Sequence, residues 1–87
     1  MEQWEFDELT EATVNRFLPR IPERYVQGFH SMLYAGELSM AVDDLVHTLS
    51  ANNVPVTRSE QEDLRRLLDH LGQPTDMLAN LTLTAQA

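Results

Sequence analysis

The sequence predicts an all-α fold, a small bundle of four to five helices with short connections, forming a single helical domain over residues 1–87. Three observations predict it. Apolar residues recur at the three- and four-residue spacing of amphipathic helices, Pro and Gly stand where such helices begin and end, and the strand pattern is weak everywhere. A chain of 87 residues has room for one modest core. Short connections favour antiparallel neighbours.

The first helix is expected over residues 7–18, with acids in its first turn, where the helix dipole favours them. Trp4 and Phe6 precede this helix and are expected to pack back onto the body. Pro19 and Pro22 end the first helix and begin the second, because Pro is disfavoured inside a helix and favoured at its first position.

The second helix is expected over residues 22–35. Its apolar stripe comprises Tyr25 or Val26, Phe29, Met32 and Leu33. Gly28 lies inside the helix, where it costs about 1 kcal/mol relative to Ala unless a neighbouring helix needs the close approach. Gly36 follows at the position of a left-handed stop.

The third helix, beginning at Glu37, has the most regular pattern. Its apolar stripe comprises Leu38, Ala41, Val42, Leu45, Val46 and Leu49. Its other side carries Ser39, Asp43, Asp44, His47 and Thr48. Asn52 or Asn53 is expected to provide the left-handed stop. The third helix is therefore predicted to bury one face and expose an acidic one.

Val54-Pro55-Val56 is expected to be extended and to plug an edge of the core. Thr57 as N-cap with Glu60 three residues on fits a capping box, and Ser59 with Glu62 is the competing frame. The fourth helix then runs to Leu71, before a stop at Gly72. Its apolar stripe comprises Leu64, Leu67, Leu68 and Leu71.

The remaining predictions concern the ion pairs of the fourth helix and the segment after Pro74. The fourth helix is expected to carry ion pairs at four-residue spacing, Arg65 with Asp69 and Arg66 with Glu62. After Pro74, either Thr75 or Asp76 caps a short turn. That turn holds Met77, Leu78 and Leu81. Residues 82–87 are expected to form a frayed tail.

The charge excludes several classes of partner. All six basic residues are Arg, fourteen residues are acidic, and the net charge is −8. Such a domain repels phosphate, which argues against binding nucleic acid or an anionic membrane surface. The absence of Cys excludes disulfides and Cys-based zinc sites. With no leader-like segment and no long apolar run, the protein is expected to be cytoplasmic.

The sequence contains no recognisable catalytic motif. His30, His47 and His70 lie on three separate predicted helices, none at a catalytic spacing to a Ser, and each is expected on a solvated face. No Gly-rich phosphate loop is present. Asp43 and His47 offer only two metal ligands, whereas a stable site needs three or four. We therefore expect no enzyme activity, no cofactor and no metal.

Negative charge is concentrated in two segments. Residues 1–18 carry five acids and one Arg, and residues 37–57 carry three acids and no basic residue, whereas residues 58–72 carry four acids and three Arg. A solvated face that only maintains solubility is the simpler interpretation. The alternative is a patch that meets a basic protein partner. Candidate contact residues are Glu37, Asp43, Asp44 and His47 on the third helix, and Glu62, Asp63 and Asp69 on the fourth.

The segment from residue 34 to residue 72 carries a family-like pattern. Gly36-Glu37 opens a helix in which Ala41 and Leu45 follow at four-residue spacing. Val54-Pro55-Val56-Thr57 then precedes a Glu-rich helix ending in Leu71-Gly72. This pattern covers about 39 of the 87 residues and resembles the MafI-like immunity family of bacterial polymorphic toxin and contact-dependent inhibition systems.

The resemblance implies a protein that inhibits a cognate toxin domain by tight one-to-one binding and has no catalytic residues. Many toxins of this kind are nucleases with a basic substrate groove, which an acidic inhibitor would complement. The alternative function is a small acidic regulatory or adaptor module, or a homodimer, without a toxin partner. Its interface would draw on exposed apolar residues, namely Trp4, Phe6, Tyr34 and Met40.

Overall fold

The computed structural model describes residues 1–84 and confirms a small all-α bundle. Helices dominate this part of the chain, and the strands are two residues long. In chain order the elements are α1 (Gln3–Phe17), η1 (Leu18–Arg20), η2 (Glu23–Tyr25), α2 (Val26–Tyr34), α3 (Leu38–Ala51), β1 (Pro55–Val56), α4 (Arg58–His70), η3 (Asp76–Asn80) and β2 (Thr82–Leu83), where η denotes a 3₁₀ helix.

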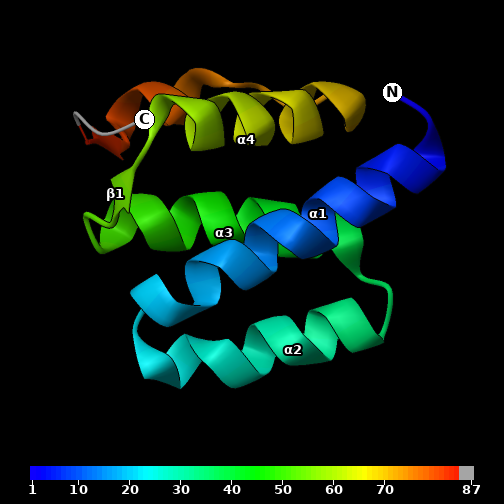
Figure 1. Cartoon of the computed structure of the whole chain (residues 1–87), viewed down its shortest axis with the longest axis horizontal. Coiled ribbons are helices and arrows are strands. Elements are labelled where there is room, and N and C mark those ends of the chain that lie inside the picture. The colour runs from blue at the N-terminus through cyan, green and yellow to red at the C-terminus, as the bar shows by residue number, and fades with distance from the viewer. Residues whose placement is uncertain (85–87) are drawn as a thin grey trace.

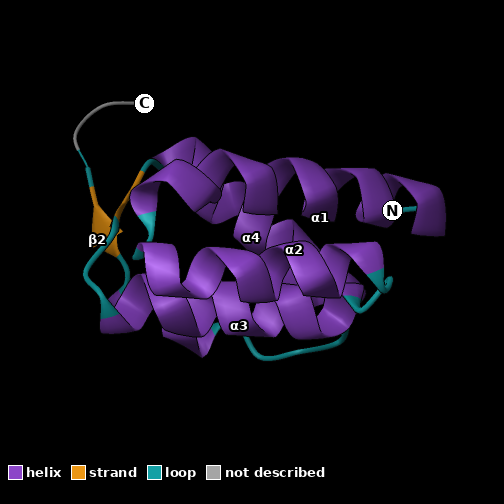
Figure 2. Ribbon diagram, turned by 90° about the horizontal axis from the view of Figure 1, so that it is seen from below, coloured by secondary structure: helices purple, strands orange, loops and turns teal. Residues whose placement is uncertain are grey.

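The helices α2, α3 and α4 alternate in direction, and α1 runs diagonally across α3 (Figure 1). The helix α1 packs against both α3 and α4, whereas α2 packs chiefly against α3. The short sheet lies at one end of the helices (Figure 2). The helix α3 is therefore central, with α1 on one face, α2 along one side and α4 with η3 along the other.

The core confirms the apolar stripes predicted for the third and fourth helices. The buried residues of α3 are Ala41, Val42, Leu45, Val46 and Leu49, and the buried leucines of α4 are Leu64, Leu67 and Leu68. The edge helix α2 buries only Phe29 fully. Val26, Met32 and Leu33 are partly buried, whereas Tyr25 is exposed. The core is thus built around α3.

The first helix begins earlier than predicted, at Gln3 rather than Asp7. The carboxylate of Glu5 accepts a hydrogen bond from the backbone N–H of Glu2 at 2.9 Å, which satisfies a donor at the new helix start. Phe6 then lies inside the helix and is buried, as predicted, but Trp4 is 62% exposed and does not pack back onto the body.

The second helix is shorter than predicted. Pro22 is followed by the 3₁₀ turn η2, and α-helical geometry begins only at Val26. A Cβ atom added to Gly28 would meet nothing within 4 Å, so no neighbouring helix needs this glycine for close approach. Gly28 therefore destabilises α2 relative to Ala, and no close helix contact among the described residues compensates for this.

The predicted helix ends are confirmed in detail. Gly36, Asn53 and Gly72 have positive φ angles of 73°, 51° and 66°, so Asn53 rather than Asn52 provides the left-handed residue after α3. The capping box takes the Thr57 frame: the Glu60 N–H donates to the Thr57 hydroxyl, and the Thr57 N–H donates to the Glu60 carboxylate.

The tail departs from the prediction of fraying at residue 82. Thr82 and Leu83 pair in parallel with Pro55 and Val56, and the Thr84 N–H donates to the Val56 carbonyl at 2.9 Å. This pairing was missed because two-residue strands are too short for a periodic pattern. The extended plug at 54–56 is confirmed, with Val56 fully buried. The prediction for 85–87 lies outside the described residues.

Candidate functional site

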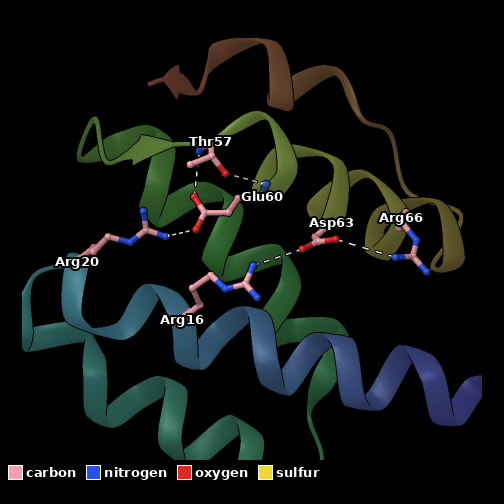
Figure 3. A network of polar contacts seen from close by, with 6 residues as sticks. All are labelled: Arg16, Arg20, Thr57, Glu60, Asp63 and Arg66. Carbon is pink, nitrogen blue, oxygen red and sulfur yellow. Dashed lines mark hydrogen bonds and ion pairs between the residues drawn. The ribbon is translucent and has the colours of Figure 1, made fainter. Parts of the chain in front are cut away.

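Some acidic side chains are partly or fully buried and pair with arginine. Glu60, at the start of α4, is the clearest example. Its carboxylate accepts a hydrogen bond from the Arg20 guanidinium at 2.5 Å while also closing the capping box with Thr57 (Figure 3). Arg20 in turn reaches the Pro55 carbonyl and lies over the ring of Phe17, 4.3 Å from its centroid. Arg20 therefore ties the end of α1 to the start of α4.

Opposing effects act on the Glu60 carboxyl group. Burial raises its pKa, but the hydrogen bonds from Arg20 and Thr57 and the positive charge of Arg20 together outweigh burial. The pKa of Glu60 therefore lies below its ordinary value of 4.5. The folded structure therefore stabilises the ionised form of the Glu60 carboxyl group. Sequence reasoning found the cap role of Glu60 but not its ion pair, because Arg20 is 40 residues away.

Asp63, a candidate contact residue, belongs to the same class. Its carboxylate lies 3.5 Å from Arg16 of α1 and 4.0 Å from Arg66 of α4, and its side chain is only 20% exposed (Figure 3). The expectation that Asp63 is an exposed acid is therefore wrong. Leu64 and Leu67 turn this side of α4 toward the core, which brings Asp63 against α1.

The other two candidates on α4 are exposed but do not join Asp63. Glu62 pairs with Arg65 at 3.6 Å. Asp69 lines a groove beside the chain start, together with Met1, Arg66 and His70. The ion pairs of α4 are at three-residue spacing, so the predicted pairs at four-residue spacing are wrong. The α4 candidates do not form one surface.

The candidates of the third helix are all exposed, and we call them together the α3 ridge: Glu37, Asp43, Asp44 and His47. The side chains of Asp43 and His47 are 55% and 58% exposed, and the ring nitrogen Nδ1 of His47 lies 3.7 Å from the Asp43 carboxylate. Within residues 1–84, no Arg lies at ion-pair distance from an acid of this ridge. Its negative charge is uncompensated by arginine there.

Two grooves flank the α3 ridge. The α2 groove, of about 320 Å³, receives Asp44 and His47 from α3. It is further lined by Thr48, Arg24, Tyr25, Gly28, Phe29 and Met32. The η3 groove, of about 310 Å³, receives Asp43. It is further lined by Val46, Leu68, Gln73, Pro74, Asp76 and Met77. The neighbouring acids Asp43 and Asp44 thus serve opposite sides of the ridge.

Sequence reasoning missed the residues that build these grooves. The sequence predicts only a possible cap role for Asp76, yet Asp76 lines the same groove as Asp43. The only available signal was the apolar pattern at Met77, Leu78 and Leu81, which implied that this turn packs on the core. It could not show that the turn lies beside α3.

The histidines do not share one environment. His30 and His47 are exposed, but His70 stacks on Phe6 with ring centroids 4.6 Å apart and lies 3.2 Å from the Gln3 side-chain oxygen. His70 is therefore partly buried rather than fully on a solvated face, because the early start of α1 brings Phe6 against its ring. Among residues 1–84, no group of three His, Asp or Glu residues is arranged to hold a metal.

Within residues 1–84, no helix has the length and apolar character needed to cross a bilayer. Comparisons with known protein families, curated proteins and solved structures find no match for this chain.

Proposed function

We propose that this protein is a cytoplasmic immunity protein that binds and neutralises a basic bacterial toxin domain, with a nuclease as the best-fitting class of toxin. The family resemblance of residues 34–72 supports this role. The α3 ridge supplies the surface, and the observation that carries the proposal is its lack of arginine partners. Acids that the fold uses are paired with arginine, whereas no arginine pairs with an acid of the α3 ridge, where the one ion-pair contact is between Asp43 and His47. These carboxylates are exposed and can meet a basic partner.

A basic partner suits both the charge and the contacts of this surface. Uncompensated carboxylates at the interface accelerate encounter with a positively charged groove. The exposed face of α2 carries no charged residue between Val26 and Tyr34, and interface centres are depleted of charge. The α3 ridge would then form the charged edge of the contact, with α2 beside it.

The second candidate is a homodimeric or adaptor module without a toxin partner. Tyr34 is 96% exposed, and Met40 is 53% exposed at the start of α3, which favours an apolar contact here. Trp4 is also exposed, but Phe6 is buried and drops out of this surface. Sedimentation of the purified protein tests the homodimeric form of the second candidate, because a stable homodimer through Tyr34 and Met40 would favour that form over the first candidate.

The test of the proposed function is protection of cells that express a toxin domain from a secreted-toxin gene directly upstream of this one; the absence of such a gene would remove most of the case. The wild-type protein should restore growth. The double substitution Asp43→Arg and Asp44→Arg should abolish protection and slow association about tenfold or more. The matched control is Glu8→Arg with Glu11→Arg, which makes the same charge change on exposed positions of α1. Equal protection by the α3 variant and wild type would exclude the α3 ridge, and failure of wild type to protect would exclude the function.

A further inference from the structure

We propose that the η3 groove receives the side chain of an arginine from the basic partner. This inference rests on the proposed function, because the partner is the toxin domain. The groove lies between α3, the end of α4 and η3. Its volume of about 310 Å³ is at the small end of the range for ligand pockets, so it suits one long side chain rather than a cofactor.

The walls of the η3 groove fit the stem of such a side chain. Val46 and Leu68 are almost fully buried and form its apolar floor, and Met77 is partly buried beside them. Pro74 adds a rigid apolar edge. Arginine packs its methylene stem along apolar surface of this kind while its charged end stays at the polar rim.

The rim of the groove fits the charged end. Asp43 and Asp76 are exposed carboxylates from two separate elements, and both line the groove. Among the described residues lining it there is no Arg and no His. The α2 groove differs, because Arg24 and His47 stand there beside Asp44. His47 also lies 3.7 Å from the Asp43 carboxylate, but from outside the η3 groove. The charge of the rim therefore favours a cation in the η3 groove, and arginine suits it because a planar guanidinium offers several donors to carboxylates.

The experiment titrates the full chain with N-acetyl-arginine amide at 0.15 M salt, about physiological strength, and follows backbone amide resonances. The control ligand is N-acetyl-citrulline amide, which has the same shape without the charge. Arginine should shift the resonances of Val46 and Met77, and citrulline should not. Asp43→Asn or Asp76→Asn should each weaken binding about threefold, the range for one exposed ion pair.

The control variant is Asp44→Asn, which makes the same charge change one residue away but lines the other groove. It should bind arginine like wild type. Equal loss in Asp44→Asn and Asp43→Asn would overturn the proposal in favour of unspecific charge attraction, and equal shifts with citrulline would overturn the role of the cation. Toxin protection that persists when arginine fails to bind would refute the groove assignment and leave the proposed function standing.

Discussion

The α1–α4 contact and the α3 ridge use the same residue types in opposite ways. In the first region Asp63 meets Arg16 near the end of α1, and Glu60 meets Arg20 of the following turn η1. On the α3 ridge, acids stand exposed with no Arg at ion-pair distance within the described chain. Acidic residues therefore play two roles in this chain: some pair with arginine and hold the bundle together, and others stand exposed on the α3 ridge without an arginine partner.

The largest effect on stability is expected from Glu60→Ala. This change removes both the capping box and the ion pair to Arg20, and should lower the free energy of unfolding by about 2 kcal/mol. Glu60→Gln is the matched control, since Gln can still close a capping box and should cost less. Urea unfolding followed by far-UV circular dichroism measures both. If Glu60→Ala lowered the free energy of unfolding by less than Asp44→Ala does, the contrast between the α1–α4 contact and the α3 ridge would be contradicted.

The pH dependence of stability should carry the signature of the same carboxylate. Because the pKa of Glu60 is lowered in the folded protein, its stabilising contribution is complete above its unfolded value, near 4.5, and is lost as pH falls through the folded value. Glu60→Gln should therefore flatten the decline in stability below pH 4.5. Identical acid unfolding of Glu60→Gln and wild type would show that the ion pair contributes nothing.

Gly28→Ala should raise the free energy of unfolding by about 1 kcal/mol. The added methyl meets no atom within 4 Å, and the helix gains propensity. For a domain of this size the melting temperature should rise by about 4 °C. This substitution probes the α2 groove beside the α3 ridge, where we infer that the fold leaves space unused. A lower melting temperature would show that α2 is packed more tightly there than described.

Asp63→Asn should lower the free energy of unfolding by about 0.5 kcal/mol, because its two arginine partners are half exposed and their attraction is screened. Arg16→Gln is the partner variant, and a double-mutant cycle isolates their coupling. A coupling energy of zero would move Asp63 into the class of free acids and weaken the contrast with the α3 ridge.

The smallest effect on stability is expected from Asp43→Asn with Asp44→Asn. Removing two like charges that have no arginine partner should change the free energy of unfolding by less than about 0.5 kcal/mol. Chemical unfolding at pH 7 measures it, with Glu60→Ala as the sensitive reference. A loss as large as that reference would show that these acids also hold the fold together.

Local rules predicted the helical elements well because their signals lie within a few residues. The stripe of α3, the left-handed Gly36 and the Thr57–Glu60 capping box all follow from spacing alone. The start of α1 was missed because the Glu2–Glu5 contact is a weak pattern without Ser or Thr at the cap.

The surface was harder to predict because it depends on contacts between distant segments. Arg16 and Arg20 are separated from their carboxylates by 47 and 40 residues, so helical spacing alone predicts Asp63 as an exposed acid. Asp76 reaches the side of Asp43 only because η3 folds back along α3. Periodicity identifies the exposed face of one helix, but it does not identify which acids are neutralised by a neighbouring one.

The most direct test of the central claim is the association rate with the toxin domain measured across a range of salt concentrations. Wild type should associate quickly at low salt and slow steeply as salt rises. Asp43→Asn with Asp44→Asn should associate more slowly at low salt, with a shallower salt dependence, while keeping wild-type stability. Equal rates and equal salt slopes for the two proteins would contradict the claim that the α3 ridge binds the partner.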